Sequence, residues 1–379
     1  MANNNNNIIL NVPNLRFPEF TGEWKKCRLC DVATLTKGVG ISKGQRSPEG
    51  HPCILYGELY TTYKSEIITD IASKTNIHSA NLVKSKHNDI IIPSSGETAI
   101  DISTARCVQY NDVLLGSDLN IIRLKDGNNG SFFSYQLNGV RKRDIAKVAQ
   151  GVSVVHLYGE TLKTIKVTLP GLAEQNKISS LLCLIDQRIS TQNKIIEDLE
   201  SLIKGIGEQI THSAHVNTML NECLECHTSA LQESDVNSQG SYPVYGANGI
   251  IGYSETYQAE CDAILIIKDG SSVGSASTVS GKFSVIGTLN YLTTKVNYSL
   301  HYIYFCLKTF NFYPYKTGMA IPHIYFKDYS NAKIYCPSFE IQCTLAKGLM
   351  NIESKIKIER EYLTSLIKQK TFLLQQMFI

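Results

Sequence analysis

Leu169-Pro-Gly-Leu-Ala-Glu-Gln-Asn-Lys-Ile178 leads into a run of apolar residues that continues to Ile210. These residues alternate in steps of four and three, which is the heptad spacing of a helix that packs along one seam. Gln192 is the polar residue that interrupts the seam. At about 1.5 Å per residue, the predicted helix is roughly 48 Å long from Ile178 to Ile210. The seam positions are Ile178, Leu182, Ile185, Ile189, Ile196, Leu199, Ile203, Ile206 and Ile210.

The same segment recurs at the end of the chain with a constant offset. Each subtraction, such as 318 − 151 and 352 − 185, gives 167. The matched pairs are Gly151 and Gly318, His156 and His323, Tyr158 and Tyr325, Pro170 and Pro337, Gln175 and Gln342, and Ile185 and Ile352. An offset that holds over some sixty residues without a gap indicates an internal repeat.

The second copy keeps the heptad seam as well. Glu359 stands where the first copy has Gln192, and Lys370 is one further polar residue. The apolar positions are Leu345, Leu349, Ile352, Ile356, Leu363, Leu366, Leu373 and Met377. We expect the two helices to pack antiparallel, in one chain or in a bundle with helices of other chains. A helix that only filled a core would tolerate insertions between copies, so the strict spacing favours a spacer whose length matters.

Composition limits the class of protein. With 379 residues, 43% apolar and 19% charged, the chain has the composition of a globular protein with two or three domains. Its net charge of +3 permits a nucleic-acid partner without requiring one. Residues 1–13 begin with an Asn-rich tract and are expected to be an unstructured leader. Because no signal peptide or membrane span is found, we expect a cytoplasmic protein with no membrane partner.

Eleven cysteines in that compartment are expected to be reduced. Cys27 and Cys30 have C-x-x-C spacing, as do Cys223 and Cys226, which precede His227. Haem attachment would need export, and a shared zinc site would need ligands from distant segments. We therefore interpret both pairs as incidental and predict no metal site.

The remaining sequence predicts two strand-rich globular parts, residues 14–170 and 213–337. In the first part, short apolar runs at 54–56, 90–92, 113–115, 121–122 and 152–157 have strand length. Residues 70–74 and 140–149 are predicted to be short helices. Tyr245-Gly246 is interpreted as the counterpart of Tyr56-Gly57, and Leu289-Asn290 as the counterpart of Leu119-Asn120. The predicted fold class is α+β: two mixed, strand-rich domains separated by long antiparallel coiled-coil helices at 171–212 and 338–379, with a pseudo-two-fold internal repeat.

The sequence contains no recognised catalytic motif. A phosphate-binding G-x-x-x-x-G-K-[ST] loop, an H-E-x-x-H helix and a G-x-S-x-G elbow are all missing. The glycine-rich segment from Gly246 to Gly252 is not expected to precede a helix. No Pro-Pro dipeptide occurs, so the loop with which amino-methyltransferases hold a flipped base is also missing. We predict no catalytic residue in this chain.

Polar and aromatic loops are the candidate binding sites. Their carboxylates and lysines can pair with base edges, while hydroxyls can contact phosphates. One loop carries Tyr56, Glu58, Tyr60, Thr61, Thr62 and Lys64. A second carries Ser94, Ser95 and Glu97, and its counterpart in the second copy carries Lys268, Asp269, Ser271 and Ser272. Such residues are also ordinary in surface turns, but their recurrence in both copies favours function.

Further candidates lie around the repeated segment and in the second part. They are Ser153, His156, Tyr245, Asn248, Lys316, Thr317 and His323. His156 and His323 each stand near a Tyr in an apolar run. Two interpretations of these histidines stay open: a structural residue with satisfied hydrogen bonds, or a phosphate contact.

Taken together, these segments resemble the specificity (S) subunit of type I restriction-modification systems. The resemblance rests on Leu15-Arg-Phe-Pro-Glu-Phe-Thr-Gly-Glu-Trp24, on the Leu169 to Ile178 segment before the heptad helix, and on the closing Leu373-Leu-Gln-Gln-Met-Phe378. It covers nearly the whole chain. In the second copy Ile341 replaces the Glu that precedes Gln175, which puts in doubt a cap or partner contact made by that Glu.

The resemblance implies that two target-recognition domains each bind one half of a split sequence in double-stranded DNA. It also implies partners: two methyltransferase (M) subunits, which carry S-adenosylmethionine, and restriction (R) subunits, which translocate and cleave. ATP and magnesium would bind partner subunits, and this chain would hold no cofactor. Two alternatives stay open, a paired-domain scaffold that binds protein and a fragment of a fused restriction-methylation enzyme.

Overall fold

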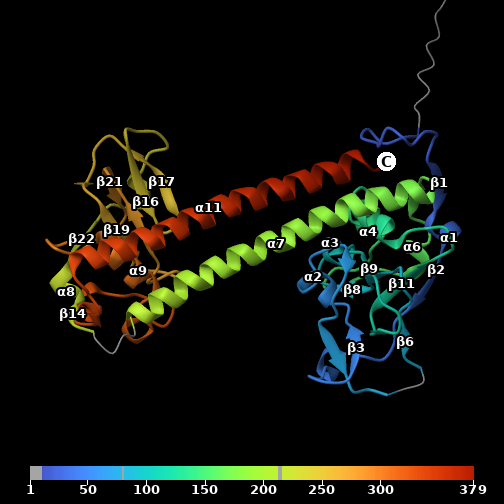
Figure 1. The fold of residues 1–379 in the computed structure, drawn as a ribbon, viewed down its shortest axis with the longest axis horizontal. Helices are drawn as coiled ribbons and strands as arrows, with labels where there is room; N and C mark the ends of the chain where they lie inside the picture. The colour runs from blue at the N-terminus through green and yellow to red at the C-terminus, as the bar shows by residue number, and fades with distance from the viewer. Residues whose placement is uncertain (1–10, 79–80, 212–215) are drawn as a thin grey trace, which may run out of the picture. The chain divides into compact units, whose positions relative to one another are not determined.

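The computed structural model describes residues 11–78, 81–211 and 216–379 (Figure 1). Two long helices, α7 (Leu172–Thr211) and α11 (Phe339–Gln376), begin and end within a few residues of their predicted limits. The chain divides into two compact units. Unit 1 comprises the described residues of Met1–Thr191 together with Leu363–Ile379, and unit 2 comprises Gln192–Tyr362. Each unit therefore contains part of both long helices.

Unit 1 begins with strands on either side of a short helix. Its elements before residue 100 are β1 (Lys25–Arg28), α1 (Leu29–Val32), β2 (Ala33–Lys37), β3 (His51–Ile54), α2 (Glu58–Thr61), β4 (Ile67–Ile68), β5 (Ser73–Thr75), β6 (Val83–Lys84), β7 (Asp89–Pro93) and β8 (Ser95–Gly96). They are followed by α3 (Ala99–Ile102), β9 (Arg106–Val108), β10 (Leu114–Leu115), β11 (Leu119–Leu124), α4 (Gly130–Asn138), α5 (Lys142–Lys147), β12 (Val155–His156), α6 (Gly159–Leu162) and β13 (Lys166–Leu169).

Two main sheets organise unit 1. One has the strand order β2-β11-β7-β9-β4, and the other β5-β3-β10-β6. Both mix parallel and antiparallel pairs, because β4 runs parallel to β9 and β10 parallel to β3. Strand β7 is buried throughout, which is why its sequence is a continuous apolar run rather than an alternating one. The α4 helix lies on this sheet and contributes Phe132, Phe133 and Tyr135 to the core.

Unit 2 repeats the plan with different residues. Its elements are β14 (Thr218–Met219), α8 (Leu220–Cys223), β15 (Leu224–Thr228), β16 (Tyr242–Gly246), β17 (Gly249–Ser254), β18 (Ala259–Glu260), β19 (Ala263–Ile267), β20 (Ala276–Val279), β21 (Lys282–Val285), β22 (Leu289–Thr294), α9 (Leu300–Thr309), α10 (Phe326–Tyr329) and β23 (Lys333–Ile334). Its sheets have the orders β15-β22-β19-β20 and β17-β16-β21-β18.

The internal repeat is visible in the strand pairing. Strand β11 lies between β2 and β7 in unit 1, and β22 lies between β15 and β19 in unit 2. In the second sheet of each unit, the parallel pair β3–β10 corresponds to β16–β21. The predicted α+β class and the repeat are confirmed.

The heptad seams are the packed faces of both helices. Every seam position predicted from the sequence is buried or half-buried. In unit 1 the first half of α7 packs with the last turns of α11, and Ile178, Leu182 and Leu373 share one core cluster. In unit 2 the second half of α7 meets the first half of α11, where Gln192 contacts Glu359. The two helices are therefore antiparallel, as predicted.

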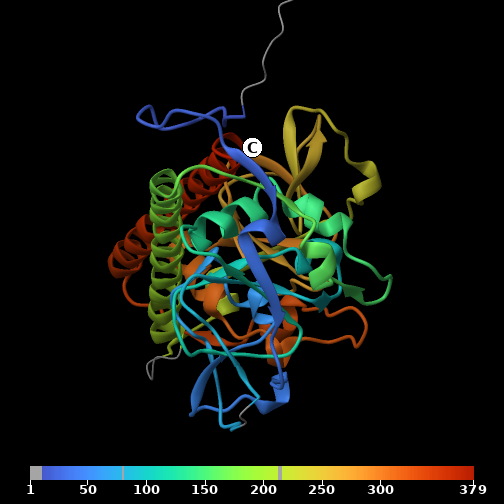
Figure 2. The same ribbon diagram turned by 90° about the vertical axis from the view of Figure 1, so that its right-hand side faces the viewer.

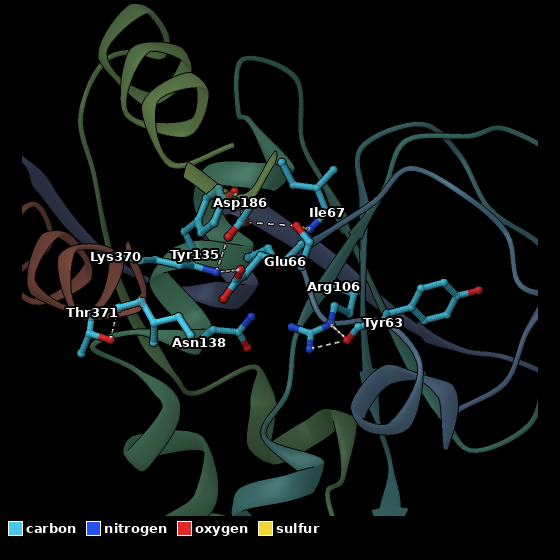
Figure 3. A network of polar contacts seen from close by, with 12 residues as sticks. Tyr63, Glu66, Ile67, Arg106, Tyr135, Asn138, Asp186, Lys370 and Thr371 are labelled. Atoms are coloured by element: carbon cyan, nitrogen blue, oxygen red, sulfur yellow. Dashed lines mark hydrogen bonds and ion pairs between the residues drawn. The ribbon is translucent and has the colours of Figure 1, made fainter. Parts of the chain in front are cut away.

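Lys370, the second polar residue of that seam, lies in a buried network in unit 1 (Figure 3). Its ammonium pairs with Glu66 and, at 2.6 Å, with Asp186 of α7. Asp186 also accepts the Tyr135 hydroxyl at 2.8 Å and the Ser65 hydroxyl at 3.0 Å. Burial alone would lower the pKa of Lys370, but Glu66 and Asp186 outweigh it and the pKa is raised. The network joins α11 to α7, to α4 and to the segment before β4.

The repeated Gln at each helix start has the same contacts in both units. The Gln175 amide donates to the Pro170 carbonyl at 2.9 Å, and its oxygen accepts the Asn129 N–H at 2.9 Å. Gln342 makes the same two bonds, to Pro337 and to Ser299, both at 2.9 Å. Asn129 and Ser299 cap α4 and α9. This conserved geometry explains why the Pro and Gln spacing is the same in both copies.

Glu174 accounts for the difference between the copies. It is buried and accepts bonds from Arg16 at 2.7 and 2.8 Å and from the Trp24 indole at 3.3 Å. The residues before β1 are thereby held against the start of α7. The Leu15 N–H also donates to the Gln376 carbonyl at 2.9 Å. Figure 2 shows the segment before β1, in dark blue, near the C-terminal end of α11. Ile341, the residue at this position in the second copy, is half exposed.

Two predictions about local structure need comment. The predicted helix at 70–74 is wrong, because β5 forms there and pairs antiparallel with β3. Ser73 and Thr75 are buried and Lys74 is exposed, an alternation that only this strand pairing satisfies. Of the predicted leader, residues 1–10 lie outside the described residues, whereas the Asn11 carbonyl accepts the Trp24 N–H at 2.8 Å. The limits 14–170 and 213–337 stay predictions.

Candidate nucleic-acid interface

The first predicted loop of unit 1 contains the short helix α2. Burial raises the pKa of Tyr60, and the nearby Tyr56 and Glu97 raise it further, so these residues belong to one region of the surface. Thr61, Thr62 and Lys64 are exposed at the end of α2. Lys64 donates to the Thr61 carbonyl at 2.9 Å.

Glu58 in the same helix has a structural position. It is 6% exposed, accepts the Leu55 N–H at 2.9 Å and also accepts the Ser73 hydroxyl. The carboxylate thus connects β3, α2 and β5 within the fold. A role of Glu58 at a base edge stays a prediction that would require this arrangement to open.

Ser94 and Ser95 are also buried, while Glu97 is exposed. The Ser94 N–H donates to the Asp118 carbonyl at 2.7 Å, and the Ser94 carbonyl accepts the Leu157 N–H at 2.9 Å. Ser95 pairs with His156 through β8 and β12. The predicted serines therefore fix the backbone beside His156, and Glu97 is the member of this group that faces solvent.

In unit 2 the corresponding segment brings four predicted residues together. Asp269 and Thr317 both form β-bridges with His323, and the Lys268 carbonyl accepts the Ile324 N–H at 2.9 Å. The Asp269 carboxylate lies 2.8 Å from the His323 Nδ1. Of the two interpretations of this histidine, the contact favours a structural residue whose imidazole is bound to a carboxylate. His156 in unit 1 is instead exposed, and its ring stacks on Tyr158 at 6.2 Å between centroids.

The other predicted residues of unit 2 occupy turns. Asn248 is exposed in the tight turn between β16 and β17, and Tyr245 is half-buried just before it. The glycine-rich segment is thus a hairpin and precedes no helix, as expected. Ser271 and Ser272 are exposed in the turn after Asp269, and Lys316 is exposed next to Thr317.

A matching hairpin stands beside each of these groups. Residues 150–156 in unit 1 and 317–323 in unit 2 each close through two backbone hydrogen bonds between their end residues. Ser153 is exposed within the first hairpin. The sequence prediction included the polar residues of these hairpins and missed their apolar tips, although the offset of 167 already pairs Val152 with Met319 and Val154 with Ile321.

The cysteine pairs are far from these groups in sequence and carry no recognisable site. Within residues 11–78, 81–211 and 216–379, no three His, Cys, Asp or Glu side chains are grouped so that they could hold a metal ion. Burial raises the pKa of Cys27, and it raises that of Cys226 to about 11. A raised pKa keeps both thiols protonated and therefore unreactive at neutral pH.

Comparison with known families matches both halves of the chain. A model of the type I restriction modification DNA specificity domain matches residues 21–201 and 220–369. The chain belongs to this family. Each matched range contains the strands of one unit, β14 excepted, together with most of a long helix, so the internal repeat is a repeat of the specificity domain.

Solved structures share this fold. The S subunit of a type I restriction-modification system from M. genitalium superposes with a TM-score of 0.68 at 18% identity, over 97% of this chain and 99% of that one. A structure described for complex assembly and conformational transition of the type I R-M system has a TM-score of 0.55 at 16% identity, over 94% and 97%. No helix among the described residues of this specificity-domain protein has the length and apolarity needed to cross a membrane.

Proposed function

We propose that this chain is the DNA-reading subunit of a type I restriction-modification complex and carries out no chemical step itself. Unit 1 would bind one half of a split target sequence and unit 2 the other half. Methylation and cleavage would be performed by M and R subunits, which would bind S-adenosylmethionine, ATP and magnesium. A cytoplasmic location belongs to the same proposal.

The observation that carries the proposal is that the two units share one backbone arrangement but expose different side chains. Both units have the same central strand order, the same hairpin and the same helix start. The exposed residues at matched positions nevertheless differ, as with Val152 and Met319. A common frame with different surface chemistry is suited to reading two different base sequences with one docking geometry.

The outer faces of the long helices support assembly with other subunits. Large apolar side chains are exposed on α7 at Leu184, Ile195 and Leu202, and on α11 at Ile358, Tyr362, Ile367 and Phe372. These residues do not belong to the seam that the two helices share. Helices of M subunits packing there would remove this apolar surface from water and complete a larger bundle.

The lengths of the helices support a spacing role. At about 1.5 Å per residue, the seam of α7 from Ile178 to Ile210 spans roughly 48 Å. One turn of B-DNA is about 34 Å. Half-sites a little over one turn apart would suit such a spacer. The modest net charge of +3 agrees with phosphate contacts being shared among several subunits.

A binding assay tests this function against its alternatives. The chain is mixed with M subunits, and binding to labelled random duplex DNA is measured at one fixed salt concentration, with and without the M subunits. We expect the complex to select duplexes that carry two separated half-sites. Full assembly without any DNA binding would support a protein-binding scaffold instead. DNA modification by the chain alone would support a fragment of a fused enzyme.

A further inference from the structure

The hairpins at 150–156 and 317–323 are built to hold one shape. Gln150 and His156 exchange backbone hydrogen bonds of 2.8 and 2.7 Å, and Thr317 and His323 exchange bonds of 2.9 and 2.8 Å. Gly151 and Gly318, the second residues of the two hairpins, have positive backbone φ angles of +123° and +85°. A Cβ atom at Gly151 would lie 2.1 Å from the Val154 carbonyl oxygen. Only glycine fits this position, so the loop is a defined structure.

The tips of both hairpins present apolar side chains to solvent. Val152 is 96% exposed and Val154 is 54% exposed. Met319 and Ile321, at the same positions of the second hairpin, are 106% and 57% exposed. Scattered apolar residues are normal on a protein surface, but here two are exposed together on a fixed tip, in both units, at the same offset. These side chains bury little surface, so they contribute little to the stability of the fold, and stability does not explain why they are apolar.

Exposed cations flank each hairpin in the sequence, and the Asp269 carboxylate at the base of the second hairpin is paired with His323. In unit 1, Arg143 and Lys147 of α5 precede the hairpin and are exposed, although Lys147 lies 3.9 Å from Asp144. In unit 2, Lys316 precedes the hairpin, and Lys327 follows it with its ammonium 5.5 Å from the Tyr325 ring centroid. An apolar tip flanked by cations complements a DNA groove, where bases lie at the floor and phosphates line the edges. If the tips bound an apolar pocket of a partner protein instead, the cations beside them would have no evident role.

We propose that each hairpin tip enters a groove of its half-site and contacts base edges through its two apolar side chains. Val152 and Val154 would do so in unit 1, and Met319 and Ile321 in unit 2. This inference rests on the proposed DNA-reading function. Apolar side chains distinguish thymine by its C5 methyl group and can press between base steps. Two short β-branched side chains and a Met–Ile pair differ in reach, so the two tips would favour different bases.

The test uses the assembled complex with M subunits. The variants are Val152→Ser with Val154→Ser in one chain, and Met319→Ser with Ile321→Ser in another. Each is assayed for target affinity and by selection from a random duplex library. We expect at least tenfold weaker specific binding and relaxed base preference in one half-site only, a different half-site for each variant. The salt dependence should not change, because no phosphate contact is removed.

Val296→Ser is the matched control. Val296 is 86% exposed in a turn of unit 2 outside the hairpin, and its replacement should change neither affinity nor base preference. Unchanged selection by both tip variants in an intact complex would overturn the inference and leave the proposed function standing. Loss of M-subunit assembly would overturn it in favour of a protein contact at the tips. If the wild-type complex selects no sequence, the proposed function itself fails.

Discussion

Gln192 and Glu359 contact each other in the seam between α7 and α11, and they are also the same position in the two copies, since 359 − 192 is 167. The Gln192 amide donates to the Glu359 carboxylate and, at 3.2 Å, to its backbone carbonyl. Lys355 pairs with the same carboxylate. A polar pair within an apolar stretch of a seam fixes the register of two helices, because a shift of one helix along the other separates the two polar side chains.

This pair predicts an asymmetry between single and double variants. Glu359→Leu should lower the midpoint of urea unfolding, because it leaves the Gln192 amide buried without its acceptor. Adding Gln192→Leu should restore the midpoint or raise it, since two leucines complete the apolar seam. Glu361→Leu, at an exposed position of α11, is the control. A double variant less stable than the single one would contradict the register role.

The Lys370 network predicts a large local contribution to stability. Lys370→Met would leave Glu66 and Asp186 close together without the ammonium that lies between them. Removing one partner from a buried ion pair costs about 3–5 kcal/mol. Lys368→Met on the same helix is exposed and should change stability by less than about 0.5 kcal/mol. Equal effects of the two substitutions in denaturant unfolding would argue against the network.

The raised pKa of Lys370 predicts where its contribution ends as pH rises. Because the folded state holds this proton more tightly than the unfolded chain, the contribution is complete below the unfolded value of about 10.4. It is lost as pH rises through the higher folded value. On the alkaline side, the stability difference between wild type and Lys370→Met should therefore persist to about pH 10.4 and shrink above it. A difference that already disappears between pH 8 and 9 would show that the ammonium is not held as described.

The proposal that each unit reads one half-site predicts the result of a domain exchange. Residues 14–150 are replaced by the equivalent segment of another member of the family, and modified bases are mapped by single-molecule sequencing. We expect one half-site to change while the other half-site and the spacer stay the same. A change in both half-sites would mean that the units do not read DNA independently.

Local periodicity accounts for what the sequence predicted well. The heptad spacing and the fixed offset predicted α7 and α11 because a seam of buried residues is visible in the chain itself. The apolar run at 90–92 predicted β7 because a short continuous run of buried residues is also visible in the sequence. By contrast, Ser73 and Thr75 form β5 only because β3 lies beside them, and pairing between distant segments leaves little trace in a short polar sequence.

The candidate site was harder to predict, because residue type does not determine exposure. Glu58 and Ser94 have the chemistry of a DNA contact but make hydrogen bonds inside unit 1. Val152 and Met319 have the chemistry of a core but are almost fully exposed. Both outcomes depend on how the chain folds back on itself. The sequence signals that marked these tips were the constant offset of 167 and the glycine that opens each hairpin, Gly151 or Gly318.

The most direct test of the account lengthens both long helices together. One heptad is inserted at Gln192 in α7 and one at Glu359 in α11, so that the seam stays paired; an insertion in α7 alone serves as the mismatched control. Seven residues add about 10 Å, or roughly three base pairs of DNA at about 3.4 Å each. Sequencing of modified bases should show both half-sites unchanged and a spacer longer by about that amount. An unchanged spacer, or altered bases in the half-sites, would contradict the account.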